Sequence, residues 1–214
     1  MSVTFSELAT DFISHIDFSK LSLAISLGSI AFNPIFWNIV ARQEYKNKIL
    51  TKLAGGNRLY GCYGLAVTIF SLGIIRDLLY ERALRDQPSW PLFAKYDLIV
   101  KALAVISFAI GNVLVLSSMW ALGITGTYLG DYFGILMDNI VTDFPFNVCA
   151  NPMYYGSTLS FLGTALWFQK PAGIFVTVFV FVMYIIALGF EEPFTAQIYA
   201  KREAERAAES QKTK

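Results

Sequence analysis

Cysteine and histidine are scarce in this sequence, which contains only Cys62, Cys149 and His15 of these types in 214 residues. Two cysteines provide no disulfide framework and no metal-ligand spacing, and a single histidine argues against a His-based metal site. The net charge is only +1, so the chain also lacks the basic excess of a nucleic-acid binder. We therefore expect no metal and no nucleic-acid partner.

Charge is missing from more than half of the chain. Five runs without Asp, Glu, Lys or Arg cover 113 of the 214 residues: 21–41, 59–75, 102–130, 144–169 and 171–190. A soluble domain of this size would carry charge along every amphipathic element. With a mean hydropathy of +0.50, this pattern excludes a soluble globule and a disordered chain. It predicts an integral membrane protein.

Three of the runs are long enough to cross a bilayer, which takes about 20 helical residues. They are residues 21–41, 102–130 and 171–190. The first of them contains Asn33-Pro34, which interrupts helical hydrogen bonding. Residues 21–41 therefore either form a kinked span or enter the membrane and return.

The other two runs contain too few helical residues to cross a bilayer by length alone. Residues 59–75 are short, but Arg58 and Arg76 flank them and we expect both side chains to extend to the interfaces. Residues 144–169 begin with Phe-Pro and Asn-Pro loop signals, so only about 153–169 is typical of a helix. The expected fold is all-α, a polytopic integral membrane bundle of four to five hydrophobic helices.

A C-terminal helical hairpin is the main topological question. If 153–169 and 171–190 both cross, they turn at Lys170-Pro171, and Asn151 and the pair Glu191-Glu192 then share one membrane face. If 144–169 does not cross, they lie on opposite faces. The distribution of Lys and Arg does not decide between these arrangements. We expect one membrane-embedded domain over residues 1–200, with no removable signal peptide, and a charged cytosolic tail over 201–214.

Polar residues gather in four short strings at or near the ends of the runs. They are Ala109-Ile110-Gly111, the glycine-rich segment 123–134, Asn151-Pro152-Met153-Tyr154 and Glu191-Glu192. Glycines four apart are also typical of close helix packing, and Asn-Pro is also typical of a helix start. The acidic pair is harder to explain structurally, because residues that mark a membrane edge are usually Lys or Arg.

These strings resemble the small membrane-bound phospholipid N-methyltransferases. The resemblance covers residues 30–200 in order and is carried by residues 32–42, 113–118, 126–136, 144–147, 151–154, 155–158 and 191–196. It is greatest for the short enzyme of the two-enzyme pathway. The resemblance implies methylation of phosphatidyl-N-methylethanolamine and phosphatidyl-N,N-dimethylethanolamine to phosphatidylcholine, with S-adenosylmethionine as methyl donor. It also implies a multi-pass protein of the endoplasmic reticulum membrane.

The resemblance also implies site residues for the donor. A Gly-x-Gly string and a Glu-Glu pair bind the donor in this family, and they correspond here to Ala109-Ile110-Gly111 and to Glu191 and Glu192. The first glycine is replaced by Ala109. The Asn-Pro-x-Tyr string is similar to the His-Pro-x-Tyr of prenylcysteine carboxyl methyltransferases, which adds Asn151 and Tyr154 to the donor site. One donor must contact both strings, which favours the hairpin.

The chemistry suggests further residues. Methyl transfer needs an amine without its proton, and Asp131 is our candidate to accept that proton. Donor and product are both cationic, and aromatic faces attract cations. We expect Tyr132 and Tyr128 to contact the lipid, although an aromatic belt at the interface is the alternative for each ring. Because the donor is made in the cytosol, residues 42–58, residues 120–152 and the tail should all be cytosolic.

Three rival functions stay open on the sequence alone. The acceptor can be phosphatidylethanolamine itself, or another membrane acceptor such as a prenylated cysteine. A third possibility is a non-catalytic scaffold or transporter, but a transporter should place ionisable groups in the middle of its spans. The oligomeric state is left open.

Overall fold

The protein is a bundle of long helices in a computed structural model that describes residues 4–139 and 141–212. The bundle is formed by α2 (Leu21–Asn47), α4 (Arg58–Arg85), α6 (Asp97–Thr127) and α8 (Pro171–Lys212). These four helices are long and apolar enough to cross a membrane. The expected class, an all-α polytopic membrane bundle, is confirmed.

The first of these helices crosses rather than returns. α2 is continuous through Pro34 and its 27 residues correspond to about 40 Å. The amide of Asn38 donates to the carbonyl oxygen of Pro34 (3.0 Å). Of the two alternatives for residues 21–41, one continuous helix of this length agrees with the span and not with a segment that enters and returns.

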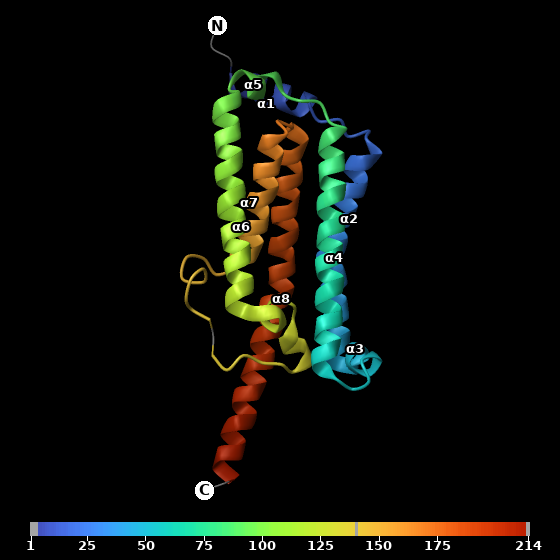
Figure 1. Cartoon of the computed structure of the whole chain (residues 1–214), viewed down its shortest axis with the longest axis vertical. Helices are drawn as coiled ribbons and strands as arrows, with labels where there is room; N and C mark the ends of the chain where they lie inside the picture. The colour runs from blue at the N-terminus through green and yellow to red at the C-terminus, as the bar shows by residue number, and fades with distance from the viewer. Residues whose placement is uncertain (1–3, 140, 213–214) are drawn as a thin grey trace.

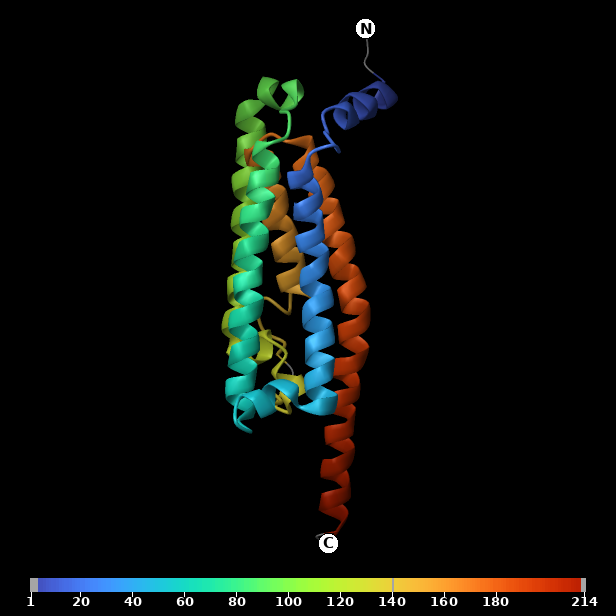
Figure 2. The same cartoon turned by 90° about the vertical axis from the view of Figure 1, so that its right-hand side faces the viewer.

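The C-terminal hairpin is present. α7 (Pro152–Trp167) and α8 are packed together and joined by a short turn, in which Lys170 Nζ donates to the carbonyl oxygen of Gln87 (2.6 Å). With 16 residues, or about 24 Å, α7 is shorter than the other long helices. α8 is much longer than its apolar run, and its charged end extends beyond the bundle as one continuous helix past residue 200 (Figure 2).

The short elements lie at the two ends of the bundle (Figure 1). At one end are α1 (Phe5–Ser14) and α5 (Pro91–Lys95), joined by a hydrogen bond from Trp90 Nε1 to Asp11 (2.6 Å). At the other are α3 (Ile49–Leu53) and the 3₁₀ turn η1 (Gly130–Phe133). Residues 42–58, the segment after α6 and the tail therefore share one end, as the sequence predicted.

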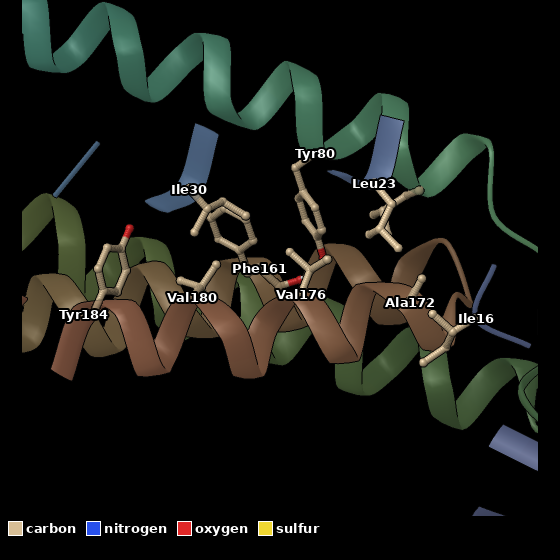
Figure 3. Close-up of a cluster of buried hydrophobic side chains, with 10 residues drawn as sticks. Ile16, Leu23, Ile30, Tyr80, Phe161, Ala172, Val176, Val180 and Tyr184 are labelled. Carbon is tan, nitrogen blue, oxygen red and sulfur yellow. The ribbon is translucent and has the colours of Figure 1, made fainter. Parts of the chain in front are cut away.

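The core joins α2, α4, α7 and α8. Figure 3 shows Ile30 of α2, Tyr80 of α4, Phe161 of α7 and Val176 of α8 among the buried side chains, with Tyr184 at the opposite end of the cluster from Ile16. The hydroxyl of Tyr80 donates to the carbonyl oxygen of Phe161 (3.0 Å), which satisfies a buried polar group.

Glycine brings α6 and α7 into direct backbone contact. A Cβ added to Gly156 would lie 2.6 Å from the carbonyl oxygen of Gly111 and 2.9 Å from Cβ of Leu114. A Cβ on Gly111 would lie 2.5 Å from the carbonyl oxygen of Gly156. Small residues at helix contacts allow this approach in membranes, where packing rather than water drives association.

We expect Gly156→Ala to destabilise the protein by about 1–3 kcal/mol, because the added methyl group overpacks this contact. Gly64→Ala in α4 is the matched control, since nothing lies within 4 Å of the position that its Cβ would occupy. Thermal unfolding in detergent measures both. Equal melting temperatures for Gly156→Ala and the unmodified protein would contradict the close contact.

Candidate functional site

A cavity of about 920 Å³ is lined by residues of α2, α4, α6, α7 and α8 and of the segment that follows α6. Most of its wall is apolar, with Phe70 and Ile74 of α4 facing Leu116 of α6. Its polar end is lined by Asp131 and Glu191, near the end of the bundle that carries η1. A volume of this size is within the range of small-molecule sites.

Glu191 is the centre of a hydrogen-bond network at the polar end. Its Oε1 accepts from Trp37 Nε1 (2.6 Å) and from the amide of Asn38 (2.7 Å), and its Oε2 accepts from the hydroxyl of Tyr154 (2.5 Å). The three donors come from α2 and α7, so one carboxylate on α8 joins three helices. An ionised carboxylate offers about four acceptor positions, which leaves about one for a ligand.

Glu192 plays a different part from its neighbour. It is exposed, and its Oε1 accepts from the amide of Asn151 (2.8 Å) at the start of α7. Adjacent helical residues point about 100° apart, so only Glu191 faces the cavity. The acidic pair and the Asn-Pro-Met-Tyr string thus meet at one face of the bundle, as the hairpin prediction required.

Asp131 lines the same end of the cavity. It is in η1, and its Oδ2 accepts from the hydroxyl of Thr195 on α8 (2.8 Å). The chain reaches this position because α6 breaks at Gly123, whose φ of 64° belongs to the left-handed region. The glycine-rich segment therefore turns the chain beneath the bundle and brings a second carboxylate toward Glu191.

The two tyrosines expected to contact the lipid have different surroundings. Tyr128 lines the cavity. Tyr132 does not: it is 2% exposed and stacks on Phe194 with ring centroids 5.0 Å apart. Arg42 covers the same Phe194 ring at 4.6 Å and donates to the carbonyl oxygen of Phe190 (2.8 Å). Tyr132 thus belongs to the packing between α2 and α8, and this packing does not support its expected contact with the lipid.

The string Ala109-Ile110-Gly111 does not line this cavity, and its contact with the donor stays a prediction. Gly111 is buried against Gly156 and Ser160 of α7, while Ala109 and Ile110 are exposed on the outer face of α6. The physical reason is the helical rotation: the face of α6 that lines the cavity carries Phe108, Asn112 and other residues instead.

Several cavity residues were not assigned by the sequence analysis. Trp37 lines the cavity and Asn38 holds Glu191 beside it; both lie inside an apolar run and within residues 32–42, which carry the resemblance, and that was the signal that could have indicated them. Arg76 was expected to extend to the interface, but its side chain points into the bundle and donates to the hydroxyl of Tyr184 (2.8 Å). Because the guanidinium finds a hydrogen-bond partner inside the bundle, it does not have to extend to water at the membrane interface.

The polar end is built to receive an organic cation. It presents two carboxylates, Glu191 and Asp131, and the cavity also contains the phenol rings of Tyr128 and Tyr154. Within residues 4–139 and 141–212, no group of three or more His, Cys, Asp or Glu is placed to hold a metal ion. The arrangement suits binding and alignment of a charged small molecule beside an apolar one.

Comparison with known proteins identifies the family. The family model for phospholipid methyltransferase matches residues 99–202. The chain is 64% identical to phosphatidyl-N-methylethanolamine N-methyltransferase of Neurospora crassa, over 92% of this chain and 91% of that protein. It is 57% identical to the Saccharomyces cerevisiae protein of the same name, over 95% and 97% of the two chains.

More distant relatives carry a related name. The chain is 44% identical to human phosphatidylethanolamine N-methyltransferase, over 90% of this chain and 96% of that protein. No solved structure matches the chain. Identities of this size over nearly the whole length leave one conclusion: the chain belongs to the phospholipid methyltransferase family and is a multi-pass membrane enzyme.

Proposed function

We propose that this enzyme methylates the amine of phosphatidyl-N-methylethanolamine and of phosphatidyl-N,N-dimethylethanolamine, giving phosphatidylcholine in the endoplasmic reticulum membrane, with S-adenosylmethionine as donor. The names of the relatives at 57–64% identity support this acceptor choice. The observation that carries the proposal is the Glu191 carboxylate, held by three donors at the polar end of a mostly apolar cavity of about 920 Å³.

The residues at the polar end fit the donor. When bound, S-adenosylmethionine supplies a methyl group on a positively charged sulfur. Trp37, Asn38 and Tyr154 fix the orientation of the Glu191 carboxylate. Little reorganisation is therefore needed for it to bind a cation. Glu192 acts indirectly, because it holds the side chain of Asn151, which lines the cavity. Such a held geometry supplies much of the rate in reactions that depend on alignment.

Asp131 is proposed to receive the proton of the lipid amine. Its Oδ2 accepts a hydrogen bond from Thr195, which orients the carboxylate at the polar end of the cavity. An amine with a pKa near 10 is protonated at neutral pH, so a proton acceptor beside the reacting nitrogen increases the reactive fraction.

The polar end of the bundle is proposed to face the cytosol. The segment 42–58, with Arg42, Lys46, Lys48, Lys52 and Arg58, lies at this end together with the charged end of α8. Basic segments of this kind favour the cytosolic, anionic surface of a membrane. A soluble donor then reaches the carboxylates directly from the aqueous phase.

The acceptor assignment is tested with purified protein in lipid–detergent micelles, radiolabelled S-adenosylmethionine and phosphatidylethanolamine carrying zero, one or two methyl groups. We expect phosphatidyl-N-methylethanolamine and its dimethyl form to be the better acceptors. A higher kcat/KM for the unmethylated lipid would overturn the acceptor assignment, and labelling of none of the three would overturn the proposed function.

Glu191→Gln should raise the dissociation constant of the donor by about tenfold or more, equivalent to about 1.4 kcal/mol, because the variant removes the charge that receives the cation. Equilibrium dialysis with radiolabelled S-adenosylmethionine measures it. Glu192→Gln is the control and should have a smaller effect, since that side chain is exposed and holds only Asn151 among the described residues. Equal donor affinities in Glu191→Gln and the unmodified enzyme would refute this role.

Asp131→Asn should lower kcat by about 10²–10⁴-fold while leaving donor affinity within about twofold, because only proton transfer is lost. Asp138→Asn is the matched control, an exposed aspartate seven residues later that does not line the cavity. Initial rates across a range of pH provide the measurement. Normal turnover of Asp131→Asn at every pH would remove this carboxylate from the mechanism.

A further inference from the structure

An ion pair between a largely buried Arg76 and an exposed Asp77 lies on α4, away from the carboxylates described above. Arg76 of α4 donates from Nε to Oδ1 of Asp77 (2.9 Å) and from Nη1 to the hydroxyl of Tyr184 (2.8 Å), and its Nη2 lies 2.8 Å from the same Oδ1 as an ion pair. Its guanidinium also covers the ring of Phe161 at 5.1 Å. The Arg76 side chain is 14% exposed and lines the cavity.

The position of Arg76 along the bundle follows from its contact with Tyr184. Tyr184 lies inside the charge-free run 171–190 and precedes Glu191 by seven residues, or about 10 Å along α8. Arg76 therefore sits on the apolar side of the carboxylate network. Ionisable groups at such positions are costly, and they usually have a functional reason. Asp77 offsets part of the cost of the cation but does not explain why it is there.

The guanidinium keeps donors for a ligand. Of its five N–H groups, the one on Nε and one on Nη1 donate hydrogen bonds to Asp77 and Tyr184. The remaining groups on Nη1 and Nη2 have no hydrogen-bond partner among the described residues, so each terminal nitrogen offers a donor. Such a pair of donors suits the oxygens of a phosphate, which arginine binds through its planar fork.

The cavity opens sideways between α4 and α6. Phe70, Ile74 and Leu78 of α4 and Leu116 of α6 line it and are nonetheless 48–62% exposed. An apolar mouth on the lipid-facing side of a membrane bundle admits acyl chains rather than a water-soluble molecule. A lipid that enters here keeps its chains in this mouth and extends its headgroup toward the polar end.

The order of groups along the cavity matches the order of groups in the lipid. From the polar end come Asp131 and Glu191, then Tyr154 and Tyr184 in edge contact at 4.9 Å, then Arg76. In the acceptor, the amine is followed by a two-carbon linker, the phosphate and then the chains. A phosphate must therefore lie on the apolar side of the reacting amine, which is the side where Arg76 lies.

We propose that Arg76 binds the phosphate of the acceptor phospholipid and so sets how far the amine extends toward the carboxylates. This assignment rests on the proposed function and adds the residue that recognises the charged part of the headgroup. Asp77 orients the guanidinium because its Oδ1 contacts both Nε and Nη2, and the hydroxyl of Tyr184 holds Nη1. The donor has a carboxylate of its own, and binding of that group is the competing assignment.

The test measures two constants separately in purified enzyme. The first is the KM for phosphatidyl-N-methylethanolamine as its mole fraction in micelles, and the second is the Kd for radiolabelled S-adenosylmethionine by equilibrium dialysis. Arg76→Gln should raise the lipid KM by about tenfold or more and leave the donor Kd within about twofold. Arg76→Lys, a point charge without the fork, should raise the lipid KM by about threefold.

Arg85→Gln is the matched control. Arg85 is on the same helix, pairs with Glu81 (2.6 Å) and covers the ring of Phe168 at 5.6 Å, but it does not line the cavity. Both constants should stay within about twofold in this variant. If Arg76→Gln yields no folded enzyme, Arg76→Lys decides alone.

Three outcomes would overturn the assignment. An unchanged lipid KM shows that the phosphate does not depend on Arg76. A higher donor Kd at constant lipid KM assigns the guanidinium to the donor carboxylate. A rise in both constants shows a general structural role. Failure of the proposed function is distinct from all three, because the unmodified enzyme would then methylate no phospholipid.

Discussion

A single carboxylate connects the helices around which the site is built. Glu191 on α8 accepts from Trp37 and Asn38 of α2 and from Tyr154 of α7. In an apolar bundle each of these donors would be costly without a partner, and the carboxylate would be costlier still. The network is therefore stable only when the three helices are in register. The geometry of the site and the packing of the bundle depend on the same four side chains.

Much of the fold follows from where charge is absent. Four of the five charge-free runs correspond to α2, α4, α6 and α8, because helices in a bilayer satisfy their own backbone groups and need apolar surfaces. The hairpin of α7 and α8 was open on the sequence and was favoured by the resemblance alone. Pro34 shows what the sequence alone cannot decide. A proline in a run allows a break in the helix, but side-chain packing decides that α2 continues.

The site was only partly predictable, because the sequence does not show which face of a helix points into the cavity or how far inside the bundle a residue lies. Strings such as Asn151–Tyr154 and Glu191-Glu192 stand out because polar residues adjoin apolar runs, and the structure brings them together. Ala109-Ile110-Gly111 stands out in the same way, yet Gly111 faces α7 and its neighbours face outward. Arg76 borders a short run and so resembles an interface residue. Its internal partner Tyr184 is 108 residues away, and no local pattern reveals that contact.

The glycine contact between α6 and α7 has a consequence for how the cavity changes size. Backbone against backbone leaves no side chain to rearrange, so these two helices form one stiff wall. On the other side, α2 and α4 are linked by the amide of Asn33, which donates to the carbonyl oxygen of Leu72 (3.3 Å). The cavity therefore keeps its size along the α6–α7 side, and the Glu191 network holds α2 to this side through Tyr154 of α7.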